Sequence, residues 1–304
     1  MILYNSLNLF LIKVFTILVP RFFHPLFALF WGRLFYLILP QTRRGIRANL
    51  QVITGQAAVD ELVRSTLYMY ARNWCDNMLI MRLRGPQLFS LIARHTGDKP
   101  LDDALAAGHG AILVSPHLGN WELGGLGLAE KGYPMNILTF REPDEKVNRL
   151  REKLRRERGI NFIYVDRDDT SPLAIIEAVN VLRRNQVLAI LGDRDGSSHT
   201  IRLEFFGRST NIPVGAAYLA LASGAPVIPV FVPLEGERYA TIMEEPIHFG
   251  SGQSHSRSIQ EGISEVMRVF ERYIRKYPDQ WYNLFDYWAV DKSEREKEAT
   301  CLRN

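Results

Sequence analysis

The sequence predicts an α/β fold in which a largely parallel, mixed β-sheet is flanked by helices. Short apolar runs alternate with segments of helical periodicity from about residue 110 onward, and this alternation is typical of parallel strands joined by helices. The 304 residues are 47% hydrophobic and 23% charged, a composition that supplies a sizeable core and excludes global disorder. No internal repeat or low-complexity linker occurs, so we expect one main domain.

Each expected strand is a short run rich in apolar, β-branched or aromatic residues, the residue types enriched in strands. The runs with this pattern are 111–115, 136–140, 161–165, 187–191, 202–206 and 226–232. Residues 239–248 are expected to add an edge strand.

The segments around these runs have the periodicity of amphipathic helices. The expected helices are 57–83, 100–107, 121–131, 144–158, 171–184, 213–223 and 256–276. Residues 291–304 are highly charged and are expected to form a flexible tail. The main domain is therefore expected to span residues 41–290.

Residues 1–40 are expected to form a hydrophobic segment that associates with a membrane. No acidic residue precedes Asp60, whereas basic residues occur throughout the same stretch. They are Lys13, Arg21, Arg33, Arg43, Arg44 and Arg47. Hydrophobicity combined with an excess of positive charge is typical of segments that contact anionic lipid surfaces.

Three arrangements of this segment remain open. The first is a single membrane span near residues 5–30 whose cations extend to the interface. The second is a pair of helices, about 5–19 and 24–38, that lie in the interface. The third is a buried helical hairpin. If a membrane is involved, the basic residues predict the cytoplasmic face of the cell inner membrane, with a peripheral or single-span attachment.

Several common function classes lack their motifs in this sequence. There is no G-x-G-x-x-G after a strand, no G-x-x-x-x-G-K-[ST] and no G-x-S-x-G, which argues against nicotinamide dehydrogenases, P-loop NTPases and serine hydrolases. The two cysteines, Cys75 and Cys301, lie far apart and exclude a disulfide scaffold or a cysteine-rich zinc site. We expect no metal, no cofactor and no nucleic-acid partner.

The segment 111–125, AILVSPHLGNWELGG, carries the clearest chemical signal. An apolar strand is followed by a turn at Pro116 and Gly119 and then by a helix, so His117 is expected at the carboxyl end of a strand, where open α/β sheets place their sites. Glu122, in the first helical turn, can fold back to accept a hydrogen bond from the imidazole and leave its other nitrogen as a general base. No protein nucleophile is evident, which suggests that the base activates a substrate hydroxyl. A structural histidine, and a carboxylate that only favours the helix dipole, remain the alternatives.

These residues resemble those of a known family. The stretch His117-Leu-Gly-Asn-Trp-Glu122 looks like the H-x-x-x-x-[DE] signature of the lysophospholipid acyltransferase superfamily. Within it, the chain is most similar to the bacterial lipid A late acyltransferases, of the lauroyl and myristoyl type, and to their relatives that acylate phosphatidylinositol mannosides. The resemblance covers roughly residues 5–290 and includes an ordered set of short motifs. They are Arg47-Ala-Asn-Leu50, Thr139-Phe-Arg141, Leu191-Gly-Asp-Arg-Asp-Gly196, Phe205-Phe-Gly-Arg208, Pro213-Val-Gly-Ala216, Pro278-Asp-Gln-Trp281 and Asp286-Tyr-Trp288.

The resemblance implies an enzyme of the lysophospholipid/glycerol-3-phosphate acyltransferase-like fold. Its implied reaction moves a fatty acyl group from an acyl thioester, on acyl carrier protein or coenzyme A, to a hydroxyl of a membrane glycolipid such as a lipid A precursor. His117 is the implied general base and Glu122 its partner. The implied substrate-binding residues are Arg141, Arg156, Asp193 and Arg208. For Arg141 an exposed surface arginine, and for Asp193 a turn-capping role, remain open.

The identity of the acceptor stays open as well. The lipid A enzymes usually carry an Asp-His-Asp-Tyr-Gly stretch where this chain has Asp193-Arg-Asp-Gly-Ser, so another lipid acceptor, of the phosphatidylinositol mannoside or lysophospholipid type, is an alternative. Two further functions are weighed against acyl transfer. One is a metal-dependent glycosyltransferase that uses Asp193 and Asp195 as a D-x-D clamp, and the other is a non-catalytic membrane-binding protein.

Overall fold

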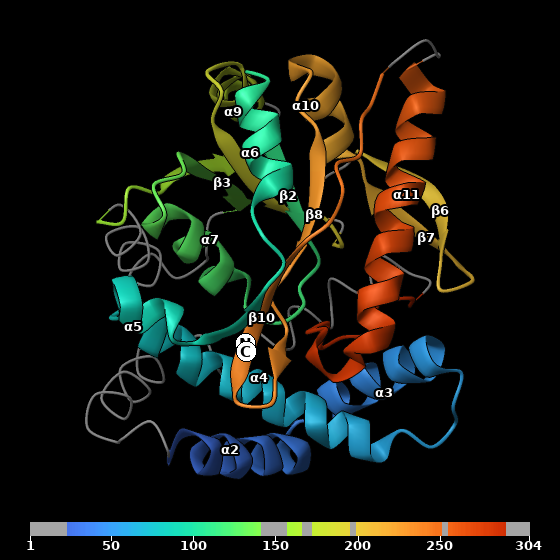
Figure 1. Cartoon of the computed structure of the whole chain (residues 1–304). Coiled ribbons are helices and arrows are strands. Elements are labelled where there is room, and N and C mark those ends of the chain that lie inside the picture. The colour runs from blue at the N-terminus through green and yellow to red at the C-terminus, as the bar shows by residue number, and fades with distance from the viewer. Residues whose placement is uncertain (1–22, 141–156, 166–171, 195–198, 251–254, 290–304) are drawn as a thin grey trace. The chain divides into compact units, whose positions relative to one another are not determined.

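A computed structural model describes residues 23–140, 157–165, 172–194, 199–250 and 255–289 (Figure 1). The chain forms two compact units. The sheet unit is Arg84–Arg272, and the helical unit combines Met1–Leu83 with Tyr273–Asn304.

The sheet unit is built on a mixed sheet that has eight strands among its described residues. They are β1 (Ile92–His95), β2 (Ala111–Ser115), β3 (Met135–Phe140), β4 (Asn161–Val165), β5 (Val187–Leu191), β8 (Val227–Phe231), β9 (Leu234–Glu235) and β10 (Arg238–Met243). Their order is β1-β10-β8-β2-β5-β3-β4, and β9 pairs with β10. The strands from β8 to β4 in this order are parallel, whereas β10 is antiparallel to β8 and β9. The predicted fold class, a largely parallel mixed sheet, is therefore confirmed.

Helices pack along the strands of this sheet (Figure 1). They are α5 (Gly85–Phe89), α6 (Lys99–Ala106), α7 (Trp121–Glu130), α9 (Leu173–Arg183), α10 (Gly215–Ser223) and α11 (His255–Lys276), of which the last turn belongs to the helical unit. Helix α9 contacts β4 and β5, α10 contacts β2 and β8, and α7 contacts β3. All five residues of β2 are buried, which explains why this strand is an uninterrupted apolar run rather than an alternating one.

A two-stranded hairpin, β6 (Thr200–Phe205) and β7 (Arg208–Pro213), stands beside the main sheet. Its two-residue turn places both Phe206 and Gly207 at positive φ, the geometry that joins tightly paired strands. The Phe206 backbone N–H donates to the Glu271 carboxylate of α11. The sequence analysis predicted one strand at 202–206 here and missed its partner, because β7 is polar and has little of the residue bias of a strand.

The helical unit contains α2 (His24–Ile38), α3 (Pro40–Thr54), α4 (Asp60–Ile80) and the 3-10 turn η2 (Pro278–Gln280). Asn49 joins its two chain segments: the side-chain amide donates to the backbone oxygens of Asn283 (2.9 Å) and Phe285 (2.8 Å), and its oxygen accepts from the Tyr287 backbone N–H (2.9 Å). The motifs near residues 47–50 and 278–288, which were identified by resemblance, are thus joined by hydrogen bonds. These bonds have a structural role in the helical unit.

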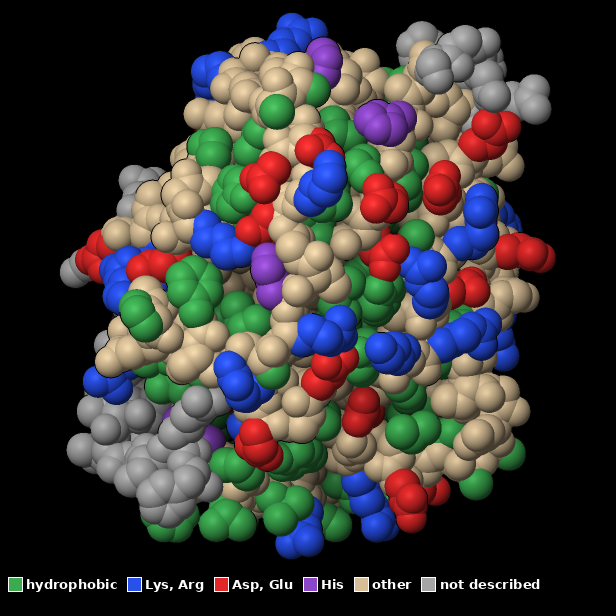
Figure 2. Space-filling model, in the orientation of Figure 1, with side chains coloured by type: hydrophobic (Ala, Val, Ile, Leu, Met, Phe, Trp, Pro, Cys, Tyr) green, Lys and Arg blue, Asp and Glu red, His purple; other side chains and the backbone are tan. Residues whose placement is uncertain are grey.

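Helix α2 has one packed face and one apolar face that is exposed in this unit. His24, Ala28, Gly32 and Phe35 are buried, and a Cβ at Gly32 would lie 2.9 Å from the Tyr68 Cα of α4, so the two helices pack closely. The opposite face exposes large apolar side chains, with Phe30 at 62% and Leu37 at 72%. In Figure 2 hydrophobic side chains gather over α2 along the lower edge of the view.

The element predictions agree closely with the structure where the two can be compared. The strands at 111–115, 161–165 and 187–191 are confirmed with the same bounds, whereas the expected edge strand at 239–248 ends at Met243. The expected helix 144–158 falls almost entirely outside the described residues. Among the described helices none has the length and hydropathy needed to cross a bilayer. Most of the expected span near residues 5–30 lies outside the described residues.

Candidate active site

A tight turn between β2 and α7 carries His117. The backbone N–H of Leu118 donates to the Pro116 oxygen (2.7 Å), and Gly119 has a φ of +65°. A Cβ at Gly119 would lie 2.2 Å from the Val232 backbone oxygen, so only glycine fits between the turn and the chain that leaves β8. The Asn120 N–H then donates to the same Val232 oxygen (2.8 Å), which fixes the turn to the sheet.

The turn closes on the first residues of α7. Asn120 is the N-cap residue, and its side-chain oxygen accepts from the Leu123 backbone N–H (2.8 Å), which satisfies one of the free amides at the helix start. The rings of His117 and Trp121 lie 5.4 Å apart in an edge-to-face arrangement. These contacts hold the imidazole at one place above the carboxyl edge of the sheet.

The residue that meets His117 comes from the neighbouring strand. Ser115 at the end of β2 is paired with Leu191 at the end of β5, so His117 and Asp193 each follow two residues beyond this pair. The Nδ1 atom of His117 lies 2.6 Å from Oδ1 of Asp193. The Asp193 side chain is fully buried and that of His117 is 16% exposed, so water screens this contact only weakly.

Both groups have shifted pKa values. Burial would raise the pKa of Asp193, but the His117 ring, the hydrogen bonds from its Nδ1 and backbone N–H, and the charge of Arg194 hold it well below its usual range. Burial and the nearby Arg194 charge lower the pKa of His117, and Asp193 only partly offsets them. At neutral pH the carboxylate is therefore charged and the imidazole neutral. A charged carboxylate only accepts, so Nδ1 carries the proton and Nε2 keeps its lone pair.

These shifts predict the pH dependence of any reaction in which His117 acts as the base. A base at this position acts in its neutral form, and the pKa of His117 lies below the ordinary value of 6.5, so kcat/KM should stay high as the pH falls through 6.5 and decline only at lower pH. The Arg194→Gln variant should move this acid limb to higher pH, since the guanidinium lowers the imidazole pKa. A pH–rate profile of both proteins checks this, and a wild-type limb at or above pH 6.5 would contradict it.

The structure gives Asp193 the contact to Nδ1 that the sequence analysis expected of Glu122. Glu122 is half-buried in the first turn of α7, where its charge favours the helix dipole. Its part in orienting His117 stays a prediction, as does a contact between Asp193 and the acceptor. Asp193 was found from the sequence by family resemblance, not as a partner of His117, because the two are 76 positions apart.

Four arginines remain to be placed: three that the sequence analysis named and one, Arg194, that it did not. Arg141 and Arg156 lie outside the described residues, so their substrate-binding roles stay predictions. Arg208 is exposed and begins β7 at the turn of the hairpin, at the opposite end of the hairpin from Thr200, and its role also stays a prediction. Arg194 was not singled out from the sequence, although its place directly after Asp193 at a strand end was the available signal.

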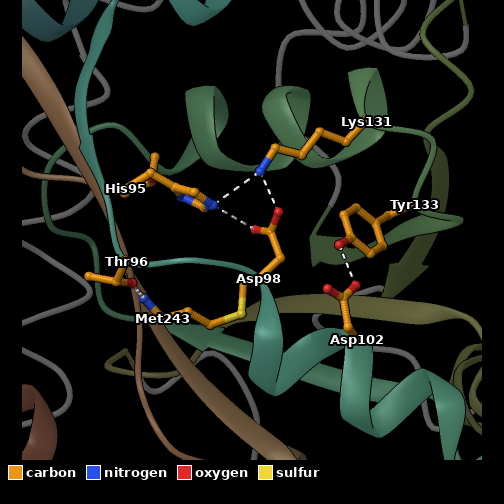
Figure 3. Close-up of polar contacts among 8 residues, drawn as sticks. His95, Thr96, Asp98, Asp102, Lys131, Tyr133 and Met243 are labelled. Atoms are coloured by element: carbon orange, nitrogen blue, oxygen red, sulfur yellow. Dashed lines mark hydrogen bonds and ion pairs between the residues drawn. The ribbon is translucent and has the colours of Figure 1, made fainter.

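A second cluster of ionisable side chains comes from β1, α6 and the residues next to them (Figure 3). Lys131 pairs with Asp98 and lies 3.1 Å from Nε2 of His95, and His95 is 3.2 Å from the same carboxylate. Beside them, the Tyr133 hydroxyl donates to Asp102 (2.6 Å), and burial, with this bond and the two aspartates, raises the Tyr133 pKa. These groups tie the end of β1 to α6 and to the residues that follow α7.

Comparison with known proteins identifies the family of this chain. Residues 2–289 match the family described as bacterial lipid A biosynthesis acyltransferase. The phosphatidylinositol mannoside acyltransferase of Mycolicibacterium smegmatis is 27% identical over 259 residues, which cover 83% of this chain and 81% of that protein. The phosphatidylinositol mannoside acyltransferase of Mycobacterium tuberculosis is 27% identical over 256 residues, 83% of this chain and 79% of its own length. The chain therefore belongs to the bacterial lipid A biosynthesis acyltransferase family and is an enzyme that transfers acyl groups.

Proposed function

We propose that this enzyme transfers a fatty acyl group from an acyl thioester to a hydroxyl group of a membrane glycolipid, with His117 as the general base. The observation that carries the proposal is the 2.6 Å contact between His117 and the buried Asp193 at the carboxyl edge of the sheet. It sets the tautomer that a base needs at Nε2. The glycosyltransferase and non-catalytic interpretations of the sequence are wrong, because the family transfers acyl groups.

The proposed reaction needs no nucleophile from the protein. As the acceptor oxygen bonds to the thioester carbonyl carbon, its proton passes to Nε2 of His117, and the Asp193 charge stabilises the imidazolium that forms. The carbonyl oxygen carries the negative charge of the tetrahedral intermediate. When this intermediate collapses, the carbon–sulfur bond breaks and the thiolate takes the proton from Nε2. The products are an ester and a free thiol, and His117 is neutral again.

Two kinds of acceptor are supported by different comparisons. The family description points to lipid A precursors, whereas the named relatives acylate phosphatidylinositol mannosides. Both are glycolipids with hydroxyl groups at a membrane surface. An acyl-transfer assay with mixed micelles of either lipid, with palmitoyl-coenzyme A or palmitoyl-acyl carrier protein as donor, tests the proposal. Mass spectrometry should find one acceptor lipid heavier by one acyl group, and failure with every acceptor and donor pair would contradict it.

The same proposal places the enzyme at the cytoplasmic surface of the inner membrane. The exposed stripe of α2 contains Phe23, Leu26, Phe30 and Leu37, at the spacing of one helix face, and Arg33 stands within it. An apolar face with cations and no acid fits a helix that lies in the interface of an anionic bilayer. This corresponds to the expected helix at 24–38, and attachment through residues 5–19 stays a prediction.

Charged substitutions on this face should weaken membrane binding. The double variant Phe30→Asp, Leu37→Asp places two carboxylates on the apolar stripe, where they lose hydration and repel anionic lipid, so flotation with phosphatidylglycerol vesicles should fall at least tenfold. The matched variant Gln56→Asp, Ala58→Asp adds the same charge at exposed positions outside α2 and should bind nearly as the wild type does. Equal flotation of both double variants would exclude α2 as the contact.

A further inference from the structure

In the side chain of Asn120, the oxygen makes a hydrogen bond within the fold, whereas the nitrogen makes none among the described residues. Its oxygen Oδ1 caps α7 by accepting from the Leu123 backbone N–H at 2.8 Å. Because a backbone N–H needs an acceptor, this bond fixes which end of the amide is the oxygen. The nitrogen Nδ2 is buried and has no hydrogen-bond partner among the described residues. The residue as a whole is 1% exposed.

A capping role alone does not account for this nitrogen. Aspartate caps helices as well as asparagine and carries no donor, and the single O–H of a capping serine or threonine lies on the capping oxygen itself. A buried donor without a partner costs free energy in the folded protein, and such groups in native proteins generally have a ligand, a water or a catalytic role. The amide of Asn120 is thus a desolvated donor that the resting enzyme leaves open.

Its position is set next to the catalytic histidine. Asn120 lies between His117 and Trp121, whose rings are 5.4 Å apart and close this five-residue turn. The backbone N–H of Asn120 is held by the Val232 oxygen and its side chain by Leu123. These two bonds hold the amide of Asn120 in the turn that carries His117, with Oδ1 engaged at the helix start and Nδ2 without a partner among the described residues.

We propose that Nδ2–H of Asn120 donates a hydrogen bond to the carbonyl oxygen of the acyl thioester and stabilises the negative charge that develops on it during acyl transfer. The inference rests on the proposed function, in which the acceptor oxygen adds to that carbonyl while His117 takes the proton. The carbonyl π-electrons move to oxygen in that step and return when the carbon–sulfur bond breaks. Asn120 forms and breaks no covalent bond, and its donor makes its strongest hydrogen bond in the transition state, as an oxyanion donor must.

Two substitutions keep the capping oxygen and remove the Nδ2 donor; the serine variant keeps only an O–H, which lies on the capping oxygen itself. Asn120→Ser is neutral and leaves an oxygen to accept from Leu123, and Asn120→Asp keeps the shape of the side chain but places a second acceptor where the donor was. Removal of one oxyanion donor typically lowers kcat by about 10²–10³-fold. We expect that loss for Asn120→Ser, with the KM for palmitoyl-coenzyme A changed less than threefold. Asn120→Asp should lose more, because its charge repels the oxyanion.

A matched change at Asn185 serves as the control. Asn185 also accepts from a backbone N–H, that of Gly110 (2.9 Å), but its amide donates to the Leu105 oxygen (2.9 Å). It precedes β5, at the edge of the sheet away from His117. Asn185→Asp should therefore lower the melting temperature and leave kcat near the wild-type value, the reverse of the result expected for Asn120→Ser.

The outcomes separate this inference from the proposed function. A wild-type enzyme that transfers acyl groups, together with folded Asn120→Ser and Asn120→Asp variants whose kcat stays within threefold, overturns the role of Asn120 alone. Loss in the aspartate variant only also overturns it, because an added charge then explains the result. A wild-type enzyme that transfers no acyl group refutes the proposed function itself.

Discussion

Replacement of His117 by asparagine should abolish acyl transfer and leave the fold intact. The asparagine amide can still donate to Asp193, so the buried carboxylate keeps a partner, but it has no lone pair that takes a proton at neutral pH. A positioned general base contributes about 10²–10⁴-fold to the rate, and we expect kcat to fall by at least that factor. Product formation followed by mass spectrometry, alongside a thermal melt, measures both properties.

Two further proteins make this test selective. His117→Ala takes the imidazole away from the buried Asp193 and should therefore also lower the free energy of unfolding, since a buried charge that loses a partner is destabilising. His95→Ala removes a histidine of β1, which lies three strands away from β2 in the sheet, and should retain normal turnover. If His117→Asn turns over substrate at close to the wild-type rate, His117 is not the base.

The Asp193→Asn variant should cost almost as much activity as loss of the base. The neutral amide can present an N–H to His117 and favour the wrong tautomer, and it removes the charge that stabilises the imidazolium. The same change in a serine protease triad lowers kcat by about 10⁴-fold, and here we expect a loss of about 10²–10⁴-fold. Because Asp193 raises the His117 pKa, any remaining activity should have its acid limb at lower pH than the wild type.

Substitutions at two other carboxylates, Asp102 and Glu122, show whether the effect is specific to Asp193. Asp102→Asn makes the same chemical change in α6, where the partner of Asp102 is Tyr133, and should leave kcat unchanged. Glu122→Gln tests the remaining sequence prediction: a loss as large as that of Asp193→Asn, with a shifted pH profile, would support a second carboxylate on the imidazole. Wild-type kinetics in Asp193→Asn would exclude Asp193 as the orienting group.

Periodicity was sufficient to predict most of the sheet unit. The strands β2, β4 and β5 are uninterrupted apolar runs bounded by polar or turn residues, and such runs have few alternative structures. Helix α3 was missed because its sequence, PQTRRGIRANLQVIT, is largely polar and its buried residues pack against partners far along the chain, Asn283 among them. Contacts between distant segments leave no local pattern in a sequence.

In the candidate site, too, features that depend on local sequence were predicted and features that depend on distant contacts were not. His117 was predicted from its place after a strand, which is local information. Its contact with Asp193 depends on β2 and β5 being neighbours in the sheet, and no spacing within residues 111–125 reveals that order. The open donor of Asn120 was also out of reach, because whether a buried amide is satisfied depends on everything packed around it.

The pairing of Ser115 with Leu191 has a consequence for how such an enzyme can change its substrate. Adjacent strands keep a spacing of about 4.8 Å, so the reach from ring to carboxylate is set by the ladder and by two short connections. One residue gained or lost between Ser115 and His117, or between Leu191 and Asp193, would turn a side chain to the wrong face. The chain that joins β3 to β4 contains neither of these connections, so a change in its length leaves both of them unaltered. New acceptor specificities can therefore be built there by insertion and deletion while the proton-transfer machinery keeps its dimensions.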